Sequence, residues 1–204
     1  MKKLQDMAYP ADFDFNTLLA LPSYEKRVNY AEEKLQRISS GSSRIVYKVD
    51  EEKVLKVAKN KKGLSQNIVE SDWGIQDMYS NIVAKVFETD EKGIFLEMEL
   101  AKKVTPNKFK QIFGFTSKDL FYYLYNEFIN NSFDMPEELI DKIFDNEWVN
   151  ELVNFAQDFD YPLPGDFGRL STYGLVNRDG EEKIVVIDFG LTNWVWDTEY
   201  AKSI

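Results

Sequence analysis

Residues 38–59 read ISSGSSRIVYKVDEEKVLKVAK, and this stretch decides how the first half of the chain folds. A run of small residues at 39–43 separates two segments rich in β-branched residues. This pattern predicts a strand, a tight turn and a second strand over 38–49. The acidic residues 50–52 predict another turn, and residues 53–59 predict a third strand.

The sequence on either side of this stretch predicts helices and further strands. Ser23 has the character of a helix N-cap, and apolar residues at helical spacing follow it as far as Leu35. Residues 64–79 predict a second helix, with Leu64, Ile68 and Ile75 near one apolar face. Two strands complete the first hundred residues, and the second half predicts several helices followed by a β-hairpin over 172–187.

The composition favours a globular protein and excludes several classes of chemistry. The chain has 204 residues, enough for one domain or two small lobes, and 44% of them are apolar. Its formal charge of −10 argues against general nucleic-acid coating, because such a chain repels phosphate backbones. The absence of Cys and His excludes disulfides, thiolate metal sites and imidazole bases. No signal peptide and no membrane-spanning segment is visible, so we expect a cytoplasmic location.

Four features that suit phosphate chemistry follow one another along the chain. The turn Ser39–Arg44 consists of small residues whose backbone N–H groups can approach phosphate oxygens closely. Lys56 in the third strand supplies a point charge for phosphates, and Glu70 in the next helix can hold its flexible stem. An acidic pair follows far downstream: Asp166 in a loop suits an incoming hydroxyl, and Asp188 after an apolar strand suits Mg²⁺.

This order resembles the protein-kinase-like fold. Residues 39–46 resemble the glycine-rich loop G-x-G-x-x-G-x-V, in which Gly41 and Val46 match while Ser39 and Arg44 replace two glycines. The resemblance implies that the loop residues Gly41 and Ser42 bind nucleotide. It further implies that Lys56 is the strand-three lysine and that Glu70 is its helical partner.

The resemblance extends into the second half of the chain. Asp188-Phe189-Gly190 is a complete DFG motif, which implies that Asp188 binds Mg²⁺, and Pro164-Gly165-Asp166 stands where H-R-D is expected, which implies that Asp166 is the catalytic aspartate. Ser171, or alternatively Thr172, stands where a second metal-binding asparagine is expected. Met98 would be the gatekeeper, and the backbone of Glu99–Ala101 would then form the hinge that pairs with adenine. The implied cofactors are therefore ATP and Mg²⁺.

The departures from the family pattern predict a reduced version of the fold. Only fourteen residues follow Gly190, which leaves no room for an activation segment or the later helices. We therefore expect an α+β, two-lobed kinase-like domain with a truncated C-lobe. Its parts would be an N-terminal extension over 1–35, a small lobe over 36–100 and a reduced helical lobe over 101–204. The chain also resembles short kinase-like proteins of tailed bacteriophages and bacteria, which would place it in a host cytoplasm.

Two functions of different classes are compatible with these residues. The first is an ATP- and Mg²⁺-dependent phosphotransferase that acts on an unknown acceptor. The second is a pseudokinase-like scaffold, or a subunit of a larger assembly, which the altered glycine loop and the reduced lobe favour. In either case we expect a protein partner that completes or covers the reduced lobe, because missing helices would expose apolar surface.

Plainer interpretations of the same residues also exist. The turn Ser39–Arg44 resembles any connection between two strands. Lys56 fits a surface lysine on an edge strand, since Lys53 and Lys59 flank it, and Glu70 fits a solvated helix face beside Asp72. Phe189 fits an ordinary core residue. For the catalytic aspartate, Asp158 and Asp160 lie close to Asp166 and are alternatives to it.

Overall fold

The computed structural model describes residues 9–130, 134–159 and 167–201. The chain forms two compact units. Unit 1 comprises Met1–Asp72, Lys85–Leu100 and Asp197–Ile204, and unit 2 comprises Trp73–Ala84 and Ala101–Trp196. Unit 1 is built around a five-stranded sheet, and unit 2 combines helices with a small three-stranded sheet. The α+β class predicted from the sequence is therefore confirmed, while the domain boundaries given above stay predictions.

The sheet of unit 1 is antiparallel throughout, with the strand order β1-β2-β3-β5-β4. The three strands predicted for residues 38–59 are confirmed, and β3 lies in the middle of the sheet between β2 and β5. The bounds are β1 Gln36–Ser40, β2 Arg44–Lys48, β3 Lys53–Ala58, β4 Val86–Thr89 and β5 Phe95–Glu99.

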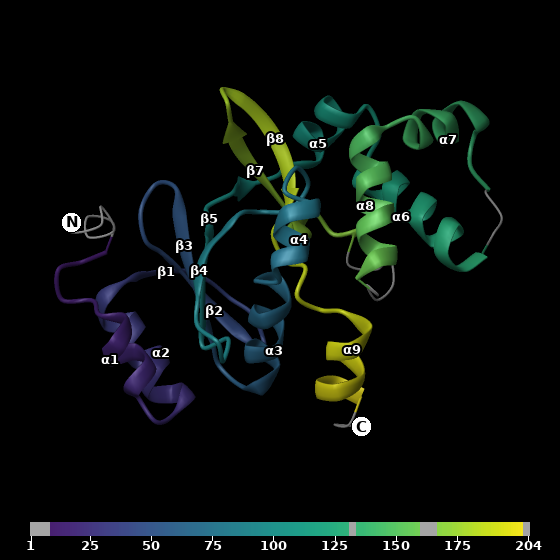
Figure 1. Ribbon diagram of the computed structural model, residues 1–204. Helices are drawn as coiled ribbons and strands as arrows, with labels where there is room; N and C mark the ends of the chain where they lie inside the picture. The colour runs from purple at the N-terminus through teal and green to yellow at the C-terminus, as the bar shows by residue number, and fades with distance from the viewer. Residues whose placement is uncertain (1–8, 131–133, 160–166, 202–204) are drawn as a thin grey trace. The chain divides into compact units, whose positions relative to one another are not determined.

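Helices cover both faces of this sheet (Figure 1). The helices α1 (Phe15–Ala20) and α2 (Tyr24–Lys34) pack against one face, and Ser23 caps α2 as predicted. The core between them and the sheet consists of apolar side chains that alternate along the strands: Leu18, Ala31, Leu35, Ile45, Tyr47, Leu55, Val57 and Phe95. Because side chains alternate between the two faces of a strand, Arg44, which precedes Ile45, and Lys56, which lies between Leu55 and Val57, are on the other face, toward α3.

The helix predicted for residues 64–79 is wrong in its length and in its apolar face. It is broken into α3 (Lys61–Glu70) in unit 1 and α4 (Trp73–Met78) in unit 2. Ile75 is buried, but Ile68 is 47% exposed. The residues of α3 that face the sheet are small or polar, and they follow helical spacing: Gly63, Gln66, Asn67 and Glu70. The apolar pattern missed this face, because helix prediction from periodicity assumes that the buried stripe is apolar.

Unit 2 contains four helices of eight or more residues within its described part: α5 (Pro106–Phe113), α6 (Ser117–Tyr125), α7 (Glu137–Phe144) and α8 (Glu147–Asp158). A short 3₁₀ turn (η2, Leu170–Thr172) precedes the hairpin of β7 (Tyr173–Arg178) and β8 (Glu181–Val186), and β6 (Lys102–Lys103) pairs with β7. The final helical turns are α9 (Asn193–Val195) in unit 2 and η3 (Trp196–Tyr200), most of which belongs to unit 1. A π-helical turn, η1 (Asn126–Asn130), follows α6.

The predicted hairpin is confirmed, but its turn is tighter than the predicted connection over 177–181, because Arg178 already pairs with Glu181. Asp179 and Gly180 both adopt positive φ angles, 56° and 83°. This is the conformation that two-residue hairpin turns with a compatible twist require, and Asp-Gly is among the pairs that favour it. Among the described residues, no helix is both long and apolar enough to cross a membrane.

Candidate functional site

The side chains of Lys56 and Glu70 form a buried ion pair in unit 1. Lys56 Nζ lies 2.7 Å from Glu70 Oε2. Lys56 is only 6% exposed, because β3 is a central strand, and it is therefore not a surface lysine on an edge. Glu70 is 0% exposed, which excludes the solvated helix face. The strand lysine and the helix carboxylate that the sequence singled out are thus in direct contact.

A third charged side chain, Arg44, joins this pair. Arg44 Nη1 lies 2.8 Å from Glu70 Oε2, the same oxygen that Lys56 contacts. Burial alone would raise the pKa of Glu70, but the attraction of Arg44 and Lys56 outweighs it, and the pKa is held below its ordinary value. Glu70 is therefore a carboxylate at neutral pH. Sequence analysis missed this role of Arg44, although it had noted that an arginine stands where the resemblance expects a glycine.

The turn between β1 and β2 is fastened through its carbonyl oxygens. Lys59 Nζ donates to Gly41 O at 2.9 Å, the Lys59 N–H donates to Ser43 O at 2.8 Å, and Asn60 Nδ2 donates to Ser42 O at 3.0 Å. Gly41 and Ser42 are exposed. A Cβ atom added at Gly41 would have Arg44 O as its nearest neighbour, 3.9 Å away, so the fold itself does not require a glycine there.

The predicted metal-binding residues lie in unit 2. Asp188 is exposed and follows β8 after one intervening residue, while Phe189 is fully buried. The Phe189 ring contacts Phe155 of α8 edge-on, with ring centroids 6.0 Å apart. Phe189 is therefore a core residue, whatever the role of Asp188. Ser171 lies exposed in η2, and the neighbouring alternative Thr172 is buried.

The remaining predicted site residues are only partly described. Asp166 and Asp160 lie outside the described residues. Asp158, the other alternative, is at the end of α8 and accepts a hydrogen bond from Tyr79 OH at 2.5 Å. Within the described ranges, no group of three or more carboxylates gathers as a metal site would require if the protein supplied every ligand. A magnesium site would thus depend on one or two carboxylates together with phosphate oxygens, which is the usual manner of Mg²⁺ binding.

The residues predicted to form the hinge belong to different units. Glu99 ends β5 in unit 1, and its N–H donates to Lys85 O at 2.8 Å. Ala101 begins the second part of unit 2, where its Cβ lies so close to Gly174 that a side chain at that glycine would clash, at 2.2 Å. The structure thus brings together Lys56, Glu70 and Arg44 in unit 1.

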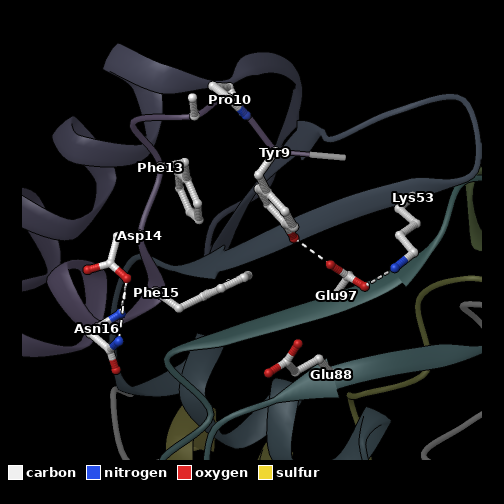
Figure 2. Close-up of a pocket in the computed structure, with 10 residues that line it drawn as sticks. Tyr9, Pro10, Phe13, Asp14, Phe15, Asn16, Lys53, Glu88 and Glu97 are labelled. Carbon is white, nitrogen blue, oxygen red and sulfur yellow. Dashed lines mark hydrogen bonds and ion pairs between the residues drawn. The ribbon is translucent and has the colours of Figure 1, made fainter. Parts of the chain in front are cut away.

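A separate pocket of about 480 Å³ lies on the opposite face of the sheet, between the sheet and the N-terminal segment, residues 9–16 (Figure 2). The rings of Tyr9, Phe13 and Phe15 contact one another there, with centroids 4.9 to 5.2 Å apart. Glu97 accepts hydrogen bonds from Tyr9 OH at 2.6 Å and from Lys53 Nζ at 2.7 Å. Burial and the contact with Glu97 raise the pKa of Tyr9. These contacts fasten the N-terminal segment to the sheet, and they lie away from Lys56.

Comparison with known proteins gives a fold likeness at low similarity. No protein-family model matches the chain, and no curated protein matches its sequence. SAICAR synthase from Saccharomyces cerevisiae, in complex with SAICAR, is 10% identical, with 76% of this chain and 73% of that one covered and a TM-score of 0.40. ADP-bound aminoglycoside phosphotransferase APH(2'')-Ib is 17% identical, with 82% and 69% covered and a TM-score of 0.34. The streptomycin–ATP complex of APH(2'')-IIa is 14% identical, with 84% and 71% covered and a TM-score of 0.34.

These neighbours are enzymes of the protein-kinase-like fold. All three TM-scores lie below 0.5, so the likeness carries no argument about what this chain binds or does.

Proposed function

We propose that this chain binds a nucleoside triphosphate with Mg²⁺ and transfers a phosphoryl group to an acceptor. The observation that carries the proposal is the fully buried carboxylate of Glu70 with Lys56 Nζ at 2.7 Å. A buried ion pair is weak evidence for stability, because apolar side chains of similar volume often stabilise a fold as well or better. Clustered buried charges with a perturbed pKa are instead a common property of functional sites.

In unit 1, Lys56 would contact the α- and β-phosphates, and Glu70 would hold its ammonium group in place. Gly41 and Ser42 would lie over the phosphates. The space around Gly41, where the nearest atom to an added Cβ is 3.9 Å away, fits a turn that a ligand approaches closely. The hinge backbone of Glu99 and Ala101 would bind the base.

In unit 2, Asp188 would bind the Mg²⁺ ion, with Ser171 as a weaker second ligand, and Asp166 would orient the acceptor hydroxyl. A bound Mg²⁺ neutralises the charge on the phosphate oxygens and orients the transferred group. The exposed position of Asp188, just beyond a buried strand, suits a carboxylate that meets a ligand from outside.

The first test is thermal unfolding with and without ATP and Mg²⁺. A ligand at about a hundredfold over its Kd adds roughly 2.7 kcal/mol, which is a rise of about 5–10 °C in Tm for a chain of this size. We expect such a rise, dependent on Mg²⁺, and its loss in Asp188→Asn. Asp179→Asn, in the exposed hairpin turn of the same unit, is the matched control and should keep the full rise. No rise under saturating nucleotide would contradict the proposal.

The transfer step needs a separate measurement, because binding alone does not show catalysis. Under the proposal, Asp166→Asn abolishes phosphoryl transfer from ATP and leaves the nucleotide-dependent rise in Tm nearly intact. Transfer that survives in both Asp166→Asn and Asp188→Asn would contradict the site assignment.

A pseudokinase-like scaffold is the second candidate. The observation that favours it is Arg44, which stands in place of a loop glycine and already contacts the carboxylate that would hold Lys56. A scaffold would show no transfer, and its biological activity would survive both aspartate substitutions. The protein partner, the phage source and the cytoplasmic location stay predictions.

A further inference from the structure

The buried face of α3 is a polar surface that meets the beginning of β2. Gln66, Asn67 and Glu70 are 6%, 0% and 0% exposed, although each carries polar atoms. Gln66 Oε1 accepts a hydrogen bond from Ser43 Oγ at 2.6 Å. Buried polar side chains cost stability unless they are paired, and a paired network fixes one arrangement of its members. The helix that carries Glu70 is thus held in register with the strand that begins at Arg44.

Arg44 occupies the centre of this network. Its Nη1 atom donates to Glu70 Oε2 at 2.8 Å and to Asn67 Oδ1 at 3.3 Å. Asn67 is itself oriented, because its Nδ2 atom donates to Gly93 O at 2.9 Å. The guanidinium group therefore has a defined position, although its side chain is long and carries considerable rotamer entropy when free.

The strand register places Arg44 and Lys56 on the same face of the sheet. Val46 of β2 lies opposite Lys56, and Arg44 lies opposite Ala58, two residues further along β3. Both cations reach one oxygen of Glu70. Arg44 is also the first residue of β2, directly after the turn that contains Gly41 and Ser42. A phosphate contacted by Lys56 and covered by that turn would therefore meet Arg44 as well.

We propose that Arg44 is a second phosphate-binding residue, which acts beside Lys56 on a nucleoside di- or triphosphate. This inference rests on the proposed function and adds a residue that the glycine-rich loop of the resembled family does not supply. A guanidinium group presents paired N–H donors in a plane, and it binds two phosphate oxygens at once where an ammonium acts as a point charge. Because Arg44 and Lys56 contact the same oxygen of Glu70, that carboxylate holds the two charged groups side by side, where one phosphate can contact both.

The test compares affinities for adenosine, AMP, ADP and ATP in the wild type and in Arg44→Gln. Glutamine keeps hydrogen-bonding capacity toward Glu70 and Asn67 but removes the charge. We expect Arg44→Gln to weaken ADP and ATP binding by at least about tenfold, the size of one charged hydrogen bond. Adenosine binding should change by less than about twofold, because adenosine carries no phosphate for a cation to contact. The double variant Arg44→Gln/Lys56→Met should lose more affinity than the two single losses predict, since each cation partly replaces the other.

Two further variants keep the result interpretable. Arg37→Gln removes an exposed arginine of the same sheet, paired with Glu32, and should leave all four affinities unchanged. If Arg44→Gln does not fold by circular dichroism, Arg44→Lys replaces it, and we expect a smaller selective loss for ADP and ATP.

The outcomes separate this inference from the function on which it rests. If the wild type binds ADP and ATP while Arg44→Gln keeps the ratio of ATP to adenosine affinity, Arg44 is only structural and the inference is wrong. It is equally wrong if Arg44→Gln binds ATP more tightly, because Arg44 would then block the site. If the wild type binds none of the four ligands, the proposed function fails first, and the inference fails with it.

Discussion

Replacing Glu70 with glutamine tests the energetics of the buried charge cluster. Glu70→Gln keeps the volume of the side chain and one acceptor oxygen, but it leaves Lys56 and Arg44 without the carboxylate at 2.7 and 2.8 Å. Removing one member of a buried ion pair costs about 3–5 kcal/mol, chiefly because the remaining charge stays buried and unpaired. For a chain of this length, that loss corresponds to a fall of about 6–20 °C in Tm.

The measurement is urea unfolding at pH 7, followed by a double-mutant cycle with Arg44→Gln. We expect the double variant to be less destabilised than the sum of the single variants, with a coupling free energy of about 0.5–3 kcal/mol. The control Glu33→Gln, on the exposed side of α2, should change stability by less than about 0.5 kcal/mol. Glu70→Gln with wild-type stability and no coupling to Arg44 would refute the reasoning.

The same carboxylate gives an expected pH dependence. The pKa of Glu70 is lowered in the folded protein from its ordinary value of 4.5, so its contribution is fully present above that value. The contribution is lost as the pH falls through the lowered pKa of the folded state, because the unfolded chain takes up the proton first. The difference in stability between wild type and Glu70→Gln should therefore shrink as the pH falls below about 4.5. A difference that stays constant down to pH 3 would contradict this assignment.

Two further predictions concern other parts of the fold. Gly63→Ala should destabilise the protein by about 1–3 kcal/mol, because its Cβ would lie 2.3 Å from Ser43 O; Gly41→Ala, which meets nothing closer than 3.9 Å, should cost less than about 0.5 kcal/mol in the same unfolding experiment. Burial and the hydrogen bond to Asp158 raise the pKa of Tyr79 from 10.0 to about 12, so wild-type stability should fall relative to Tyr79→Phe as the pH rises from 10 to 12. Equal alkaline sensitivity of the wild type and Tyr79→Phe would contradict the second prediction.

The sequence predicted the elements whose signals are local. The Asp179-Gly180 turn needs positive φ angles that few residue pairs adopt, and the Ser23 cap uses a side chain adjacent to the N–H groups that it satisfies. The strands within residues 38–59 are marked by β-branched residues on either side of a run of small residues, a signal that a short segment of sequence contains. Lys56 and Glu70 were singled out because their spacing matched a known arrangement, and the structure places their charged groups in contact.

The sequence did not reveal the polar interface between α3 and the sheet. By sequence, Ile68 lies on the predicted apolar face and Glu70 also fits a solvated one, whereas the structure buries Glu70 together with Gln66 and Asn67 and leaves Ile68 47% exposed. The reason is that Gln66 and Asn67 bond to Ser43 and Arg44, which lie more than twenty residues earlier in the chain, so no local pattern records the pairing. A helix that buries polar side chains and exposes an apolar one breaks the usual pattern, and such exceptions are expected where a site requires buried charge.

Affinity labelling with an acyl phosphate of ATP tests the central claim most directly. In this reagent the acyl group is bonded to the terminal phosphate, and a neighbouring lysine amine takes the acyl group while ATP leaves. Digestion and mass spectrometry then identify the labelled lysine among those of the chain. We predict that Lys56 is acylated, that excess ATP prevents the labelling, and that Lys59, which follows β3 and contacts Gly41 O, is labelled far less. Labelling that spreads over exposed lysines, or that excess ATP does not prevent, would contradict a nucleotide site at Lys56.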